Sequence, residues 1–176
     1  LIPLCVACQF AKQQQRNPPT QITHNKPETK GALSVDALAP GERVSVDIYI
    51  SSARGCLPGT FGKEREIAQY IGGSIFVDHA TRLLYHQHQW STTAAETINS
   101  KYQFERFCSK HGHKVKEFIG DNNPFNKMEW IADCENQHQK TTFSGVGAHH
   151  QNYSERMQQT VFYMARAMLM HFAMHW

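Results

Sequence analysis

The order of its apolar segments is the feature that most constrains the fold of this chain. Alternating or β-branched runs come first, and shorter strand-like runs then alternate with helical patterns. Early neighbouring strands followed by a β-α-β-α order predict an α/β fold, in which a mixed five-stranded sheet has helices on both faces. The expected strands are 43–50, 70–77, 83–89, 115–119 and 140–143, and the expected helices are 92–111, 125–136 and 152–176.

Residues 1–35 differ in composition from the rest of the chain. They hold the pair Cys5-x-x-Cys8, a glutamine run and two adjacent prolines. Low hydrophobicity and proline favour an extended arm. We therefore expect an N-terminal segment over 1–35 and a folded core over 36–176. The chain begins without a methionine and ends inside a helical pattern, which predicts that it is a piece of a longer protein.

The composition argues against some classes of protein but does not identify the function. The formal net charge of +3 permits nucleic-acid binding and does not require it. Five cysteines, an odd number, argue against a secreted disulfide framework and favour a reducing nuclear or cytoplasmic compartment. The most apolar stretch, 161–176, is too short for a membrane span and contains Arg166. We therefore expect no membrane partner.

Three acidic residues stand in settings that suit a metal site. Asp47 lies within the alternating run 44–50, Asp121 follows a second apolar run, and Glu155 opens the last helical pattern. Hard divalent cations take carboxylate oxygens as ligands, and a pair of such cations can clamp the attacking and leaving oxygens of a phosphodiester. The three acids are therefore candidate metal ligands.

Each of these acids also has a structural explanation. Asp47 can face solvent, because the apolar residues of its run form the other face of the strand. Asp121 lies in a Gly-Asp-Asn-Asn-Pro sequence that favours a turn. Glu155 follows Asn152 by three residues and completes a capping box. A fourth acid, Asp78, sits in a hairpin-turn sequence and is expected to shape that turn. The pattern alone leaves these alternatives open.

Several stretches together resemble a known family. In chain order they are Cys5-Val6-Ala7-Cys8-Gln9-Phe10-Ala11-Lys12, Val46-Asp47, Phe76-Val77-Asp78-His79-Ala80-Thr81-Arg82, Gly120-Asp121-Asn122, His149-His150-Gln151-Asn152 leading to Glu155-Arg156, and 161–176. In order and spacing they are similar to the integrase catalytic core of retroviruses and long-terminal-repeat retrotransposons. The resemblance is greatest to the copia type.

The resemblance implies a ribonuclease-H-like fold and an Asp-Asp-Glu site that binds two Mg²⁺ or Mn²⁺ ions. Asp47, Asp121 and Glu155 are the matching residues. The implied activity is 3′ processing of retroelement DNA followed by strand transfer into target DNA, inside a nuclear or cytoplasmic retroelement particle. The implied partners are the element ends, the target DNA and further copies of the chain, with no small-molecule substrate.

The resemblance also implies half of a zinc site, and polar residues of the chain predict contacts to nucleic acid. Cys5 and Cys8 are half of a tetrahedral zinc site, and Zn²⁺ is expected only in a longer protein that supplies the other ligands. Contacts to nucleic acid, mostly to phosphate, are expected from eight polar or basic residues, and the alternative is a solvated polar helix face. The eight residues are Lys12, Arg16, Asn122, His150, Gln151, Asn152, Arg156 and Gln159.

The spacing of the second and third acids defines the main alternative function. Thirty-three residues, 122–154, separate Asp121 from Glu155, which is fewer than the family usually has. One missing residue near a helix start turns a side chain by about 100°. The chain could then be a catalytically impaired integrase-like fragment for DNA binding or assembly. A ribonuclease-H-like nuclease or transposase that does not join ends is a third hypothesis.

Two other patterns have structural explanations. His86 and His88 share one face of the strand 83–89, where we expect both to be exposed and to bind no metal. The last helical pattern carries an apolar stripe that predicts packing in the core or between copies. Its members are Met157, Val161, Met164, Met168 and Phe172.

Overall fold

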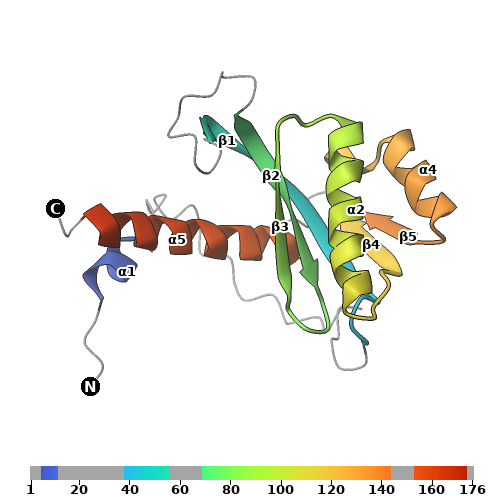
Figure 1. Ribbon diagram of the computed structural model, residues 1–176, viewed down its shortest axis with the longest axis horizontal. Coiled ribbons are helices and arrows are strands. Elements are labelled where there is room, and N and C mark those ends of the chain that lie inside the picture. The colour runs from blue at the N-terminus through green and yellow to red at the C-terminus, as the bar shows by residue number, and fades with distance from the viewer. Residues whose placement is uncertain (1–4, 12–37, 56–68, 144–152, 174–176) are drawn as a thin grey trace, which may run out of the picture. The chain divides into compact units, whose positions relative to one another are not determined.

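The computed structural model describes residues 5–11, 38–55, 69–143 and 153–173 of the 176 in the chain. Figure 1 shows its helices and strands. In chain order they are α1 (Val6–Ala11), β1 (Val44–Gly55), β2 (Tyr70–Asp78), β3 (Leu84–Gln89), α2 (Ala94–Lys110), β4 (Glu117–Gly120), α3 (Asn122–Phe125), α4 (Met128–Asn136), β5 (Lys140–Phe143) and α5 (Tyr153–Ala173).

Contacts divide the chain into two compact units. The larger unit, Val35–Gln158, holds the sheet, α2, α3, α4 and the first turns of α5. The second unit combines Leu1–Ser34 with Gln159–Trp176, so α5 runs through both units. In the described part of the chain, no helix is both long and apolar enough to cross a membrane.

The described strands form one mixed sheet in the order β3-β2-β1-β4-β5. Strand β2 is antiparallel to both β1 and β3, whereas β4 is parallel to both β1 and β5. The parallel neighbours are joined through helices, as parallel pairing requires. This is the five-stranded ribonuclease-H-like sheet expected from the sequence, and β1 is its central strand.

The main core lies between one face of the sheet and the helices α2 and α4. Strand β1 turns Val44 and Val46 to this face, where both are fully buried. Helix α2 packs on β2, β3 and α4, and α4 also packs on β5 (Figure 1). The Phe76 ring of β2 stacks on Phe104 of α2 with their centroids 4.8 Å apart. The buried apolar residues of this cluster are Val44, Val46, Phe76, Phe104, Cys108, Val115, Phe118, Phe125, Trp130 and Cys134.

Helix α2 lies within the range 92–111 expected from the sequence and differs from it by at most two residues at each end. Thr93 is its N-cap, and the Thr93 side chain accepts a hydrogen bond from the backbone N–H of Glu96 at 3.4 Å. The chain leaves the helix through Gly112, whose φ of 80° lies in the left-handed region that glycine adopts without steric cost.

Two sequence-based boundaries were wrong. The single helix expected over 125–136 is two helices, because the Asp121 carboxylate caps an earlier start and Lys127 has an extended backbone. Strand β1 continues to Gly55, into a segment expected as loop. Residues 6–11, in the N-terminal segment that holds Cys5 and Cys8, form helix α1, where Ala7 and Ala11 are buried one helical turn apart. Most of the expected arm lies outside the described residues.

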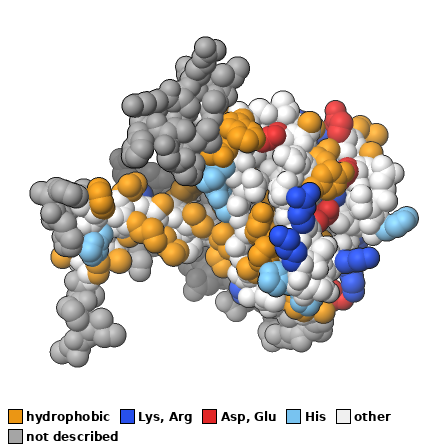
Figure 2. All heavy atoms as spheres, in the orientation of Figure 1, with side chains coloured by type: hydrophobic (Ala, Val, Ile, Leu, Met, Phe, Trp, Pro, Cys, Tyr) orange, Lys and Arg blue, Asp and Glu red, His pale blue; other side chains and the backbone are white. Residues whose placement is uncertain are grey.

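The end of α5 exposes an apolar surface. Figure 2 shows orange side chains along this helix. The expected stripe is only partly covered, since Val161 is half-buried and Met168 is 66% exposed. The large apolar side chains exposed on this helix are Phe162, Met164, Met168, Leu169 and Phe172.

A buried cation joins α2 to α4. Lys101 of α2 is fully buried, and its Nζ lies 2.6 Å from Asp133 Oδ2 of α4 and 3.2 Å from Glu105 Oε1. Tyr102 donates a hydrogen bond to the same Asp133, which raises the pKa of Tyr102 to about 12. A buried charge is tolerated only when it is paired, so this group fixes α4 against α2.

We predict that Asp133→Asn destabilises the fold, because the substitution leaves the buried ammonium of Lys101 with Glu105 alone. The expected loss is about 2 kcal/mol, less than the ~3–5 kcal/mol for a fully broken buried pair, since one partner remains. Urea unfolding measures it. Glu135→Gln, which changes an exposed acid of the same helix, is the control. Equal midpoints for the two variants would contradict the prediction.

Candidate functional site

The pairing of β1 with β4 brings two of the candidate acids together. The parallel register pairs Val44 with Phe118 and Ser45 with Ile119. The same offset, continued by two residues, brings Asp47 beside Asp121 at the carboxyl end of β4. Neighbouring strands lie about 4.8 Å apart, and residues directly beside each other share a sheet face. The two strand acids therefore occupy one row, on the face opposite the main core.

Backbone N–H groups orient both carboxylates. Asp47 Oδ1 accepts a hydrogen bond from the N–H of Ile48 at 2.8 Å. Asp121 Oδ1 accepts one from the N–H of Asn122 at 2.7 Å, as the N-cap of α3. Both acids are half-buried. Asp121 thus has the turn-forming role that its sequence predicted, and this role is compatible with a position at the end of a strand.

The third acid, Glu155, lies in the first turn of α5 and is half-buried. That turn is held against the sheet face of Asp47. The Tyr153 ring centroid lies 4.9 Å from that of His79 and 4.2 Å from the guanidinium carbon of Arg82. His79 Nε2 in turn lies 2.7 Å from Ser45 Oγ, on the row next to Asp47. Helix α5 therefore begins on the face that carries the two strand acids.

The described residues do not form a metal site that contains all three acids. Within them, no three His, Cys, Asp or Glu side chains lie close enough together to hold one metal ion. The register thus brings Asp47 and Asp121 into one row, and Glu155 does not complete a group with them in this structure. Asn152, the expected cap of the last helix, lies outside the described residues.

Half of the residues expected to bind nucleic acid or zinc fall in described segments. Lys12, Arg16, His150, Gln151 and Asn152 lie outside them. Asn122, Arg156 and Gln159 are exposed on helices. Cys5 and Cys8 are exposed and form no disulfide, and hydrogen bonds with Cys8 lower the pKa of Cys5.

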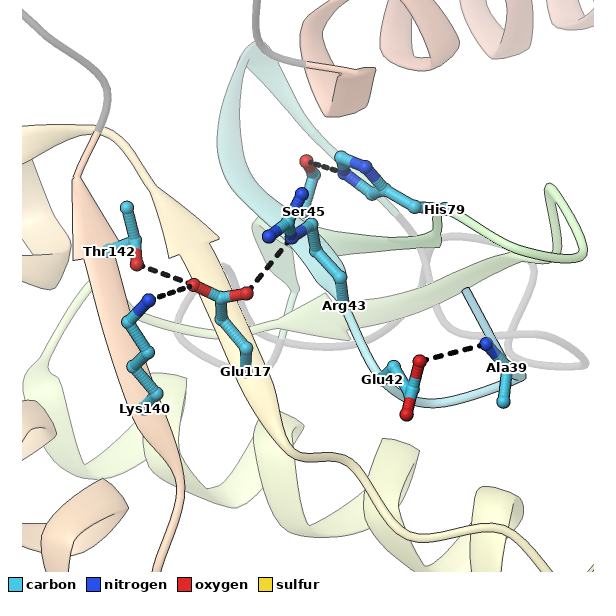
Figure 3. Close-up of polar contacts among 8 residues, drawn as sticks. All are labelled: Ala39, Glu42, Arg43, Ser45, His79, Glu117, Lys140 and Thr142. Atoms are coloured by element: carbon cyan, nitrogen blue, oxygen red, sulfur yellow. Dashed lines mark hydrogen bonds and ion pairs between the residues drawn. The ribbon is translucent and has the colours of Figure 1, made fainter. Parts of the chain in front are cut away.

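On the same sheet face as the row of acids, at the start of β4, a buried carboxylate is neutralised by its neighbours (Figure 3). Glu117 of β4 accepts from Arg43 Nε at 2.9 Å, from Thr142 Oγ1 at 2.7 Å and from Lys140 Nζ at 3.2 Å. Burial alone would raise the pKa of Glu117, and these three partners outweigh it, so the pKa is lowered. This acid therefore stays ionised and ties β5, β4 and β1 together.

Asp78 shapes the β2–β3 turn, as its sequence suggested. It accepts hydrogen bonds from the N–H of Gly41 at 3.0 Å, from the N–H of Thr81 at 2.8 Å and from Thr81 Oγ1 at 2.6 Å. These bonds account for its burial and leave it no evident role as a ligand. The adjacent His79 is 1% exposed. Burial, together with the charges of Arg43 and Arg82, lowers the pKa of His79 to about 4.

Sequence analysis missed a cluster further along the same sheet face. His86 was expected to be exposed, and the structure corrects this, because the imidazole is half-buried and hydrogen-bonded with the Tyr49 hydroxyl. His88 is exposed, as expected. The sequence signal for this cluster was the Gly72-Gly73 pair of β2, the strand between Tyr49 and His86. Glycine in a strand interior often marks a close approach of other groups.

No protein-family model matches the chain, and no curated protein matches it. Among solved structures, the chain is similar to the HTLV-2 integrase catalytic core domain in complex with magnesium. The dimeric form has 20% identity over 60% of this chain and 62% of that chain, with a TM-score of 0.47. The trimeric form has 20% identity over 62% and 63%, with a TM-score of 0.47.

The chain is also similar to a chain of the simian T-cell lymphotropic virus intasome in complex with PP2A regulatory subunit B56 gamma. That match has 16% identity over 73% of this chain and 42% of that chain, with a TM-score of 0.49. In each of these three comparisons, the chain spans less than two thirds of the solved chain's length.

We predict that stability falls as the pH falls from about 6.5 toward 4. In this window an unfolded His79 takes up a proton that the folded residue, with its pKa of about 4, does not bind. The loss from His79 is at most about 3 kcal/mol. His79→Gln should therefore flatten the pH dependence of the unfolding free energy, whereas His113→Gln, at an exposed site, should not. Identical slopes for the two variants would contradict this assignment.

Proposed function

We propose that this chain is an integrase-like catalytic core that carries out two-metal polynucleotidyl transfer on DNA, comprising 3′ processing and strand transfer. The supporting observation is the β1–β4 register, which pairs Val44 with Phe118 and Ser45 with Ile119 and, extended by two residues, would align Asp47 with Asp121 on the face where α5 begins. The assignment to a copia-type retroelement polyprotein rests on the sequence resemblance. In this proposal the DNA partners are the element ends and the target, and the chain works as a homo-oligomer.

The donor chemistry of the proposed site suits hard cations. Asp47, Asp121 and Glu155 would hold two Mg²⁺ or Mn²⁺ ions, because such ions prefer carboxylate oxygens. When bound, the ions would supply positive charge to the attacking oxygen and to the leaving oxygen of the phosphodiester. Asp47 and Asp121 would supply two of these ligands. The proposal also requires the Glu155 carboxylate to move toward them.

The chain's own contribution is to hold its carboxylates in place before the reaction. Asp47 lies on the central strand, and the N–H of Ile48 orients its carboxylate. Asp121 is fixed by its cap to α3. The Tyr153 ring, against His79 and Arg82, sets where α5 starts and therefore where Glu155 stands. Groups held by rigid elements lose little free energy to reorganisation when charge develops.

Two further assignments complete the proposal. Exposed Asn122, Arg156 and Gln159, with the expected contacts outside the described residues, would bind DNA phosphates and position the strand without reading its sequence. Cys5 and Cys8 would supply half of a zinc site in a longer protein.

One observation favours a second candidate, a catalytically impaired fragment that binds DNA or supports assembly. The described acids do not group as a three-ligand site. The shortened stretch between Asp121 and Glu155 gives a physical reason, because it alters the direction of the Glu155 side chain. The two candidates share a fold and differ in whether Glu155 reaches the ions.

The test incubates the purified chain with Mg²⁺, labelled element-end DNA and a target plasmid. Joined product supports strand transfer. Cleavage without joining indicates a nuclease or transposase, and binding without product indicates the impaired fragment. We predict that Asp121→Asn lowers product formation by at least on the order of 10²-fold, the cost of losing one charge-stabilising group.

Asp121→Asn is suited to this test because asparagine caps a helix as well as aspartate does, so folding is retained. The matched control is Glu129→Gln, an exposed acid in the first turn of α4. Unchanged product with Asp121→Asn would end the catalytic assignment of this residue.

A further inference from the structure

Three donor side chains from two strands converge on one face of the sheet. The Tyr49 hydroxyl of β1 is hydrogen-bonded with His86 Nε2 of β3. The same hydroxyl lies 3.5 Å from His88 Nδ1. The two imidazole rings have centroids 4.4 Å apart and are nearly perpendicular, at 86°. One oxygen and two nitrogens therefore surround a common point.

A glycine in the intervening strand makes this convergence possible. The register aligns Tyr49 with Gly73 and Gly73 with His88, so the phenol reaches across β2 to meet β3. A Cβ atom at Gly73 would lie 3.0 Å from Tyr49 Oη and 3.0 Å from His86 Nε2. The space above Gly73 is therefore the space into which the donors point.

The cluster is held from one side and open to solvent on another. The Tyr70 ring stacks on His88 with their centroids 4.9 Å apart, and the Tyr49 ring stacks on His86 at 5.3 Å. His88 is exposed, so a solute ion can reach the nitrogens. Burial and the neighbouring His88 lower the pKa of His86 to about 4, which leaves that imidazole neutral at neutral pH.

We infer that Tyr49, His86 and His88 form a binding site for a transition-metal dication such as Zn²⁺ or Cu²⁺. Imidazole is the ligand that suits these ions, and three protein donors leave one position for water. Two histidines at alternate positions of a strand are about 6.6 Å apart along it, a separation that two imidazoles can bridge. On binding, the phenol gives its proton to solvent and its oxygen becomes the third ligand.

This site differs in chemistry from the proposed row of acids. Tyr49 lies two residues beyond Asp47 on the same strand face. Its partners are nitrogen donors, which suit borderline-soft ions, whereas the carboxylates suit hard ions. The described residues contain no group of three His, Cys, Asp or Glu side chains that could hold a metal ion. The proposed site agrees with this finding, because its third donor is a phenol.

The test is calorimetric titration of Zn²⁺ into the full chain after removal of any purification tag. Cys5→Ser and Cys8→Ser are introduced first, so that the thiols do not compete for zinc. We expect one equivalent to bind. Tyr49→Phe and His88→Ala should each weaken binding by at least about 10-fold, the smallest loss typical even for an outer partner of a metal ligand. The control His113→Ala, at another exposed histidine, should leave the affinity unchanged.

A second readout uses Cu²⁺. The wild-type complex should have a visible absorption band from phenolate-to-copper charge transfer, and Tyr49→Phe should lose it while its circular dichroism stays that of the folded protein. Absence of zinc binding would overturn the inference, as would an affinity that survives combined loss of His86 and His88. Asp121→Asn should bind Zn²⁺ normally, so this result is independent of the outcome for strand transfer.

Discussion

The pairing of β1 on both of its edges is the constraint on which the rest of the structure depends. As the central strand, β1 cannot shift by one residue without turning Val44 and Val46 out of the core and Ser45 and Asp47 into it. The register that buries Val44 and Val46 therefore also fixes which residues lie on the opposite, polar face. Every group discussed on the polar face takes its position from that single register.

Several buried polar groups of the polar face are paired with one another, which stabilises that face. Glu117 meets two cations and a hydroxyl, and Ser45 meets His79. Such pairing offsets much of the desolvation cost of burying polar atoms beside a central strand. It also makes the face rigid, which is what the carboxylates of a metal-dependent site require from their surroundings.

Local patterns predicted most of the fold. The alternation around Val46 indicated a strand with one apolar face, and the helical pattern over 92–111 predicted α2 to within two residues at each end. The expected start of one helix was wrong because Asp121 caps an earlier turn. The burial of Lys101 against Asp133 was not predicted, because it depends on how α4 packs on α2. A salt bridge between distant helices leaves no periodic signal in the sequence.

By itself, the sequence determined which residues could do chemistry and which strand or helix each would occupy, because periodicity and capping are local properties. It placed Asp47 in a strand, Asp121 at the end of a strand and Glu155 at the start of a helix, as the structure has them. Only the tertiary structure decided which side chains meet. Strand order put Asp47 in a row with Asp121, and an intervening glycine let Tyr49 reach His86. Neighbours across a sheet are set by register and by the packing of distant segments, which no short stretch of sequence encodes.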